Sequence, residues 1–220
     1  RDLHNRKQSF PTRRSSDLLA MADLPGPVEL LDAGVGRGVM SFYLLRAFPE
    51  MHATLVDVIE NYGLGRHIFF PEGDPTHRYS YKHLNLHEQD RDTRYGLVLC
   101  MDVLEHIVFW RPVLHSLWEV VAPGGYLYAQ TPANYPSPTY PRSLILRKNL
   151  KQRLNRLLPR WVPFDGVYHV RHGLSCKTLK DESDRLGARL LVAGEQYLPS
   201  PFFPPCGFKP RTSILMQKPR

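Results

Sequence analysis

Residues 28–38 have the sequence VELLDAGVGRG, and this stretch decides the expected fold. An apolar run ends at Asp32, three glycines then alternate with other residues, and an amphipathic run follows over residues 40–48. This order predicts a buried strand, a tight turn and a helix, which form the first unit of a doubly wound α/β sheet. Because glycines lack a Cβ atom, the backbone can turn sharply there and a ligand can approach the main chain.

The spacing of these glycines separates two kinds of nucleotide ligand. A dinucleotide-binding turn follows G-x-G-x-x-G, which would put the third glycine at position 39, where this chain has Val39. The third glycine instead comes at Gly38, giving D-x-G-x-G-x-G from Asp32. At this acid and the three glycines the stretch resembles the first motif of the class I methyltransferases that depend on S-adenosylmethionine (SAM). A nicotinamide-dependent oxidoreductase is the least favoured enzyme, because Val39 interrupts the pyrophosphate turn.

Two further segments predict strands that end in polar residues. Residues 52–58 (HATLVDV) end at Asp57 and Val58, and an acid at the end of a second strand is placed to accept both ribose hydroxyls of an adenosine ligand. Residues 79–86 (YSYKHLNL) alternate as a third strand does. In the resembling family an acid often lies at its end, near the adenine amino group; this chain has Asn85, whose amide oxygen can also accept.

The middle of the chain continues the α/β rhythm. Residues 95–101 (YGLVLCM) predict a fully buried central strand. A helical pattern follows up to the Pro-Gly-Gly at 123–125, and residues 126–130 predict a fifth strand. These segments are similar to the fourth-strand, Glu-His and Pro-Gly-Gly segments of the same methyltransferases.

The end of the chain completes the predicted sheet. Ser175 is a plausible N-cap of a helix over 177–186, and residues 188–196 and 212–217 predict two closing strands. We therefore expect a Rossmann-like, doubly wound, mostly parallel seven-stranded sheet with an antiparallel C-terminal hairpin.

The resemblance implies a set of cofactor-binding residues. The segment from Asp32 to Gly38 would support the methionine portion of SAM, Asp57 its ribose, and Asn85 with Leu86 its adenine. The residues expected at the cofactor are Asp32, Ala33, Gly34, Val35, Gly36, Gly38, Asp57, Val58, Asn85, Leu86 and Met101.

A second constellation follows the fourth strand: Asp102, Glu105 and His106, at positions i, i+3 and i+4. On a helical turn these three side chains would share one face, and two carboxylates with an imidazole suit a divalent metal. The spacing is similar to the metal-binding Glu-x-x-Glu-His of ubiquinone-biosynthesis O-methyltransferases and small-RNA 2′-O-methyltransferases, with Asp102 replacing the first Glu. The favoured interpretation has no metal, with Glu105 capping local amides and His106 lining the pocket. His106 and His169 are the candidate catalytic bases.

Residues 131–168 depart from the sheet pattern and predict an insertion after the fifth strand. A basic amphipathic helix is expected over 143–158. Three interpretations remain open: a lid over the substrate pocket, which we favour, a surface helix that contacts acidic lipid headgroups, and a plain packed helix.

The first eighteen residues are polar, basic and aperiodic, and resemble a translated sequencing adapter. We expect residues 1–18 to be a disordered or artefactual tail and residues 19–220 to be one domain; if the tail is an artefact, the true N-terminus is missing. The net charge of +8 is concentrated in this tail and in 133–164, which has seven basic residues and no acid, so it does not by itself indicate nucleic acid. We expect a cytoplasmic protein, because the three cysteines are scattered and the sequence shows neither a signal peptide nor a long apolar run.

The sequence thus predicts an enzyme that transfers a methyl group from SAM to a small-molecule acceptor, at oxygen. A metal-assisted RNA 2′-O-methyltransferase and a SAM-binding module without turnover are the alternatives. The basic segment lacks the aromatic platforms that stack RNA bases, so a nucleic-acid partner is not favoured. The acceptor and the oligomeric state cannot be read from the residues.

Overall fold

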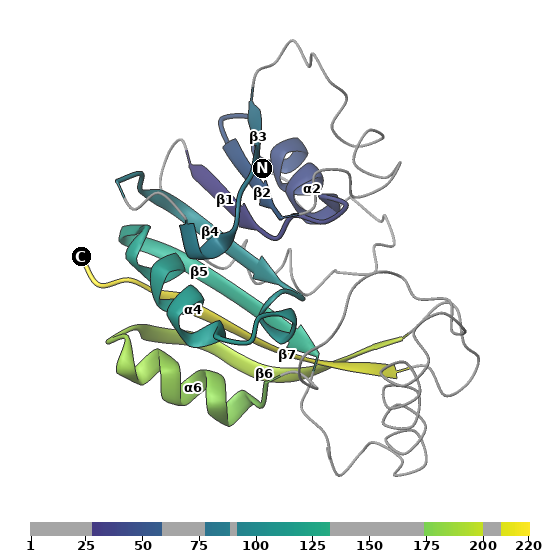
Figure 1. The fold of residues 1–220 in the computed structure, drawn as a ribbon, viewed down its shortest axis with the longest axis vertical. Helices are drawn as coiled ribbons and strands as arrows, with labels where there is room; N and C mark the ends of the chain where they lie inside the picture. Colours follow the sequence, from purple (N-terminus) through teal and green to yellow (C-terminus); the bar gives the residue numbers. More distant parts are fainter. Residues whose placement is uncertain (1–27, 59–77, 89–91, 133–173, 200–207) are drawn as a thin grey trace, which may run out of the picture.

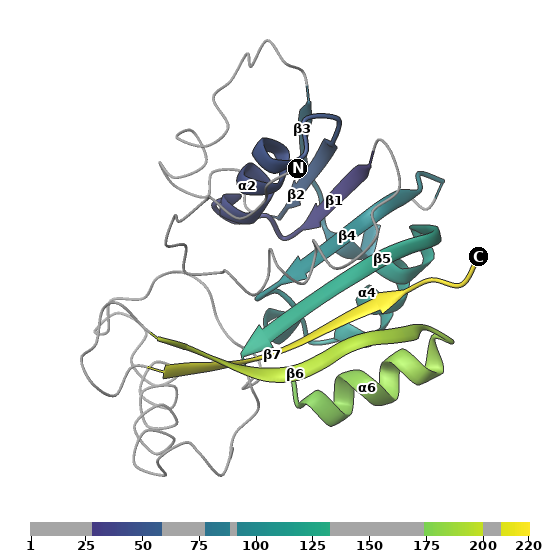
Figure 2. The same cartoon turned by 180° about the vertical axis from the view of Figure 1, so that it is seen from behind.

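The computed structural model describes residues 28–58, 78–88, 92–132, 174–199 and 208–220. They form a seven-stranded sheet in the order β3-β2-β1-β4-β5-β7-β6, which runs through the middle of the molecule (Figures 1 and 2). Strands β1 to β5 are parallel, and β7 is antiparallel to both β5 and β6. The expected α/β fold, with a parallel sheet and an antiparallel C-terminal hairpin, is confirmed.

The strands are β1 Glu29–Ala33, β2 His52–Asp57, β3 Tyr79–His83, β4 Tyr95–Met101, β5 Val121–Pro132, β6 Arg189–Pro199 and β7 Phe208–Gln217. The α-helices are α2 Val39–Ala47, α4 Trp110–Glu119 and α6 Cys176–Arg185. Short 3-10 turns span Leu86–Glu88 and Leu104–His106.

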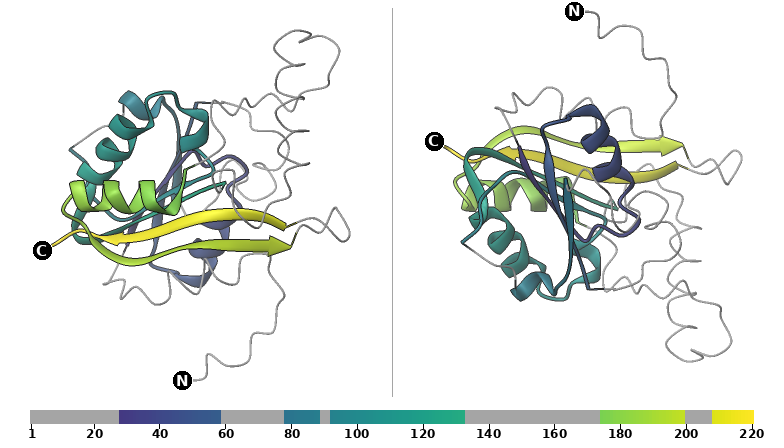
Figure 3. Two further views of the ribbon diagram at one scale, coloured as in Figure 1. Left: turned by 90° about the horizontal axis from the view of Figure 1, so that it is seen from below. Right: turned by 90° about the horizontal axis from the view of Figure 1, so that it is seen from above.

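Hydrophobic residues cover both faces of the sheet. Because successive side chains of a strand point to opposite faces, Leu31 packs in the cluster that includes Trp110 and Leu179 from α4 and α6, whereas Leu30 packs with Leu44 of α2. Figure 3 shows α4 and α6 on one side of the sheet and α2 on the other. The sheet is therefore the middle of three layers.

Strand β4 is the centre of this core, as its continuous apolar run predicts. Residues 97–100 have no exposed surface, which is typical of a parallel strand that is covered on both faces. Cys100 is a free thiol there, and burial raises its pKa, so it is an unreactive packing residue.

The topology places the site. Strand β1 pairs with β2 on one side and with β4 on the other, so the connections lead away from β1 in both directions. Parallel α/β sheets bind ligands outside the carboxyl ends of their strands at such a point. The ends of β1, β2 and β4 are therefore where a ligand is expected.

Two strands differ from their predicted lengths. Strand β3 ends at His83 instead of position 86, because the chain turns there and His87 N donates to Asn85 Oδ1 at 3.1 Å. Strand β5 begins at Val121 instead of 126, since Val121 already pairs with Tyr95 before the register shifts. Gly125 permits this irregularity: a Cβ there would lie 2.9 Å from Gly96 O.

The C-terminal helix and hairpin lie close to where they were expected. Ser175 is the N-cap of α6, and its Oγ accepts from Thr178 N at 3.0 Å, as predicted. Strands β6 and β7 are longer than the alternating segments that predicted them.

Two predicted segments fall on residues outside the described ranges: the tail 1–18, and the insertion at 131–168 beyond Pro132, with its basic helix at 143–158. These assignments and the domain boundaries stay predictions. Among the described residues, none of the helices has the length and apolar content that crossing a membrane requires.

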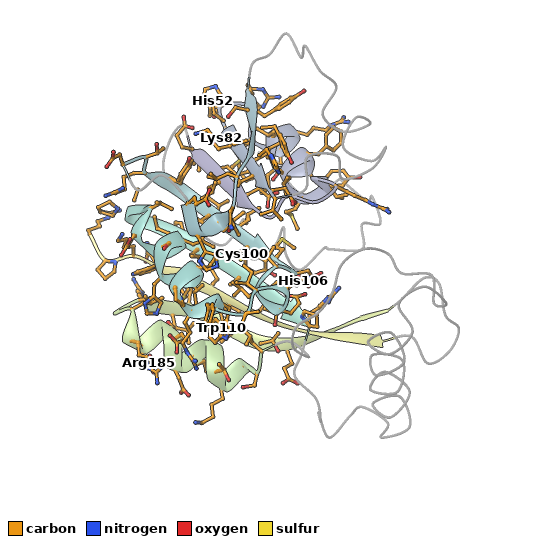
Figure 4. All side chains as sticks on the ribbon, viewed as in Figure 1. His52, Lys82, Cys100, His106, Trp110 and Arg185 are labelled. Atoms are coloured by element: carbon orange, nitrogen blue, oxygen red, sulfur yellow. The ribbon has the colours of Figure 1, made fainter. Side chains whose placement is uncertain are left out.

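A buried carboxylate joins the two helices on one face of the sheet. Glu182 of α6 is only 1% exposed and accepts from Arg111 Nε at 2.8 Å and from His115 Nε2 at 3.2 Å, both on α4. Arg185, one turn further along α6, also pairs with it, and Figure 4 labels this side chain on α6. Burial disfavours the charged form of Glu182, but the hydrogen bonds from Arg111 and His115 and the nearby guanidinium charges outweigh it, so its pKa is lowered.

This network predicts a pH-dependent loss of stability in Glu182→Gln. A lowered folded-state pKa means that the contribution of Glu182 is present above the unfolded value, about 4.3, and is lost as the pH falls through the folded value. We expect the substitution to lower the free energy of unfolding by about 2 kcal/mol at pH 7 and by progressively less below about pH 4. Urea unfolding across this range measures it.

The matched control is Asp184→Asn, which removes an exposed acid from the same helix and should change little. An equal loss for Glu182→Gln at pH 3 and pH 7 would show that ionisation of Glu182 contributes nothing.

Candidate active site at the carboxyl ends of β1, β2 and β4

The turn after β1 is built on left-handed backbone. Gly34, Gly36 and Gly38 have φ values of +82°, +52° and +70°. Residues other than glycine rarely adopt this backbone region. Gly34 N and Val35 N both donate to Val56 O of β2, at 2.8 and 2.9 Å. The turn is thereby fixed to the neighbouring strand, and Gly38 serves as the N-cap of α2.

The acid at the end of β2 holds the same turn. Asp57 is 6% exposed, and its Oδ2 accepts from Gly36 N at 2.8 Å. The glycine turn and the strand-two acid, which the sequence separates widely, are therefore one hydrogen-bonded unit.

The residues after β4 close the other side of the turn. Val103 lies against Gly34 so closely that a Cβ built on this glycine would be 2.3 Å from Val103 Cγ2. Glycine is thus required at position 34 for two reasons, its φ value and its contact with Val103.

These elements enclose a cavity of about 320 Å³, which is the volume range of small-molecule sites. The strand ends, the turn at Leu86 and the segment after β4 all contribute to its wall. Its lining residues are Gly34, Gly36, Asp57, Val58, Asn85, Leu86, Met101, Asp102, Val103, His106 and Ile107.

Most of the residues predicted for the cofactor line this cavity, but four do not. Asp32, Ala33, Val35 and Gly38 are absent from its lining. Asp32 is buried and accepts a hydrogen bond from Ser41 Oγ of α2. Burial raises the pKa of Asp32 to about 6. The hydrogen bond from Ser41 opposes this rise, and the nearby charge of Asp57 adds to it.

The predicted shared face of Asp102, Glu105 and His106 is wrong. Asp102 precedes the 3-10 turn and has a left-handed φ of +56°, so helical spacing does not apply to it. Its Oδ2 pairs with Arg211 Nη2 at 2.9 Å, whereas Glu105 is fully buried and does not line the cavity.

Among the parts of the chain that the structure describes, no three His, Cys, Asp or Glu side chains gather as a metal site. The donor arrangement after β4 therefore does not fit a divalent metal.

The two candidate bases stand differently. His106 lines the cavity, with its Nε2 atom 3.8 Å from Glu105 Oε1, and Figure 4 shows it near the carboxyl end of β4. His169 lies outside the described residues and stays a prediction.

Sequence reasoning missed Val103 and Ile107 as wall residues, although both lie in the segment that follows β4. Their place directly after a parallel strand was the signal that could have identified them. It also missed Arg211, for which the sequence offers no local signal.

Together, the sheet order, the glycine turn and the strand-two acid define a class I SAM-dependent methyltransferase, a class whose methyl donor is SAM. The chain belongs to a methyltransferase domain family, whose sequence profile matches residues 4–191.

A curated relative is a ubiquinone biosynthesis O-methyltransferase of Hydrogenovibrio crunogenus (strain DSM 25203 / XCL-2). It is 28% identical over 102 residues, which cover 46% of this chain and 42% of that protein. The match therefore spans less than half the length of this relative.

Solved structures share the fold across nearly the whole chain. The N-methyltransferase NodS of Bradyrhizobium japonicum WM9, in complex with S-adenosyl-L-homocysteine (SAH), has a TM-score of 0.61 at 15% identity and covers 94% of this chain and 86% of its own. The magnesium protoporphyrin IX methyltransferase of Synechocystis PCC 6803, also with SAH, has a TM-score of 0.59 at 17% identity, covering 92% and 79%. At these identities the likeness shows the fold.

The contact between Gly34 and Val103 predicts a large effect of Gly34→Ala. The new Cβ would both overlap Val103 and strain the left-handed backbone, so we expect the free energy of unfolding to fall by about 3 kcal/mol. Chemical denaturation measures the loss.

Gly187→Ala is the matched control, because Gly187 has a φ of +62° but a Cβ added there would meet no atom within 4 Å. It should cost about 1 kcal/mol. Equal losses in the two variants would mean that Val103 does not restrict position 34.

Proposed function

We propose that this protein binds SAM in the cavity and transfers its methyl group to the oxygen of a small-molecule acceptor. The observation that carries the proposal is the hydrogen bond between Gly36 N and Asp57 Oδ2 in the cavity wall. It brings an acid and a bare backbone turn together where a nucleoside can contact both.

Asp57 is the residue proposed for the ribose. A carboxylate accepts from up to four directions, so the bond from Gly36 leaves Asp57 capacity for the two ribose hydroxyls. The glycine turn would then face the methionine portion, because Gly34 and Gly36 line the cavity and carry no side chains of their own.

Asn85 and Leu86 are proposed for the adenine. Leu86 is buried and offers an apolar surface to a ring, and both residues line the cavity. Asn85 Oδ1 accepts from His87 N at 3.1 Å, and an amide oxygen has a second lone pair for the adenine amino group.

When bound, SAM supplies an electrophilic methyl group on a sulfonium, so catalysis depends largely on holding the acceptor in line with it. The cavity can exclude water with Met101, Val103 and Ile107, which contribute apolar side chains near the end of β4.

His106 is proposed as the base for a hydroxyl acceptor. Its imidazole lines the cavity and would accept the proton of the hydroxyl as the oxygen attacks. Glu105 Oε1 lies 3.8 Å from the Nε2 atom of this imidazole. The name of the Hydrogenovibrio relative, an O-methyltransferase, supports oxygen as the acceptor atom.

The cofactor assignment predicts specific binding of SAM and SAH, measured by isothermal titration calorimetry with NADH as the comparison ligand. Asp57→Ala should weaken SAH binding by at least about tenfold, the loss expected for charge-assisted hydrogen bonds. Glu29→Ala is the control, because Glu29 is an exposed acid at the opposite end of β1. Binding of NADH in preference to SAH would contradict the proposal.

The acceptor assignment predicts turnover that depends on His106. A panel of phenols, catechols, alcohols and amines is incubated with SAM, with and without EDTA, and SAH release is recorded. For a hydroxyl acceptor, His106→Ala should lower kcat about 100-fold, a larger change than in SAH affinity.

His52→Ala provides the control, since Figure 4 shows His52 on the part of the sheet away from His106. Turnover of amines alone would contradict oxygen as the acceptor atom, and SAH binding without turnover of any acceptor would indicate a SAM-binding module.

A further inference from the structure

Asp102 has an uncommon backbone conformation in the cavity wall. Among the described residues it is the one non-glycine residue with a positive φ, +56°. Aspartate tolerates this region better than most residues, but the conformation still has to be held by its surroundings. One such contact is the hydrogen bond from Asp102 N to Gln130 O of β5, at 2.8 Å.

A second contact comes from a distant strand. Arg211 of β7 pairs with Pro132 at the end of β5, and its Nη2 lies 2.9 Å from Asp102 Oδ2. The side chains are 21% and 40% exposed. Arg211 thus reaches past the end of β5 to hold the residue that follows β4.

The conformation of Asp102 sets the direction of the next residue. Val103 comes immediately after it and packs against Gly34, where no Cβ would fit. Both Asp102 and Val103 line the cavity. A continuous chain of contacts therefore runs from Arg211 through Asp102 and Val103 to the glycine turn.

We infer that Arg211 is a positioning residue of the cofactor site: its ion pair with Asp102 holds the turn after β4 so that Val103 stays against Gly34. This inference rests on the proposed function, since it concerns the same cavity. It assigns the C-terminal hairpin, which contributes no lining residue among those described, a role in cofactor binding.

The experiment compares SAH affinity in variants by calorimetry. Arg211→Met should weaken SAH binding about tenfold, because binding must then also restore the left-handed turn. Arg211→Lys, which keeps the charge, should retain binding within about threefold. Arg189→Met is the control, because it removes an exposed arginine from β6 of the same hairpin.

A second background separates positioning from a general loss of stability. Glycine adopts a positive φ without strain, so Asp102→Gly removes the need for the ion pair. Adding Arg211→Met to the Asp102→Gly variant should therefore lower its SAH affinity by less than about twofold. This holds even if thermal unfolding shows that Arg211→Met lowers Tm in both backgrounds.

The outcomes are distinguishable. The inference is supported if Arg211→Met weakens SAH binding tenfold in the wild-type background and does not weaken it further in the Asp102→Gly background. Unchanged SAH affinity in Arg211→Met, or equal weakening in both backgrounds, overturns it and leaves the proposed function standing, provided that wild-type protein binds SAH. Failure of the wild-type protein to bind SAH overturns the proposed function and this inference together.

Discussion

The hydrogen bond from Gly36 N to Asp57 Oδ2 is the contact on which the site depends. It forms in a turn where the chain leaves β1 through left-handed glycines, with the amide of Gly36 directed toward the end of β2. It also needs β1 and β2 to be parallel and in register, with Ala33 opposite Val56, so that the turn and the acid meet at one edge. A local backbone requirement and a long-range pairing are thus combined in one bond.

The layers around the sheet keep this edge rigid. Leu30 and Leu31 anchor β1 in the two opposite cores, and residues 97–100 of β4 have no exposed surface. Behind the turn, the buried pair of Asp32 and Ser41 links the end of β1 to α2. The glycines therefore leave the backbone open to a ligand, while these contacts hold that backbone in place.

The sequence was sufficient wherever the signal was local. The glycine pattern, the apolar run of β4 and the cap at Ser175 each follow from the conformations that their residues prefer, and each lies where it was predicted. Asp57 was predicted from its place at the end of the second strand, and Asn85 and Leu86 from the resemblance to the methyltransferases; all three line the cavity. Asp102 was misjudged because helical spacing was applied to a residue that is not helical.

Contacts made by folding itself could not be predicted. Arg211 reaches Asp102 from another strand, and Val103 acquires its role only because Gly34 faces it; neither pairing leaves a pattern in the sequence. The early end of β3 and the early start of β5 depend on a side-chain turn at Asn85 and on the close approach of Gly125 to its neighbours. His169 and the basic helix at 143–158 lie outside the described residues and stay predictions.

The central claim is that the cavity at the ends of β1, β2 and β4 is a SAM site, and a crystal structure of the full chain with SAH tests it most directly. We expect the ribose hydroxyls within hydrogen-bonding distance of Asp57, the adenine beside Asn85 and Leu86, and the amino-acid portion against the glycine turn. SAH bound elsewhere, or in this cavity with its ribose away from Asp57, would contradict the claim.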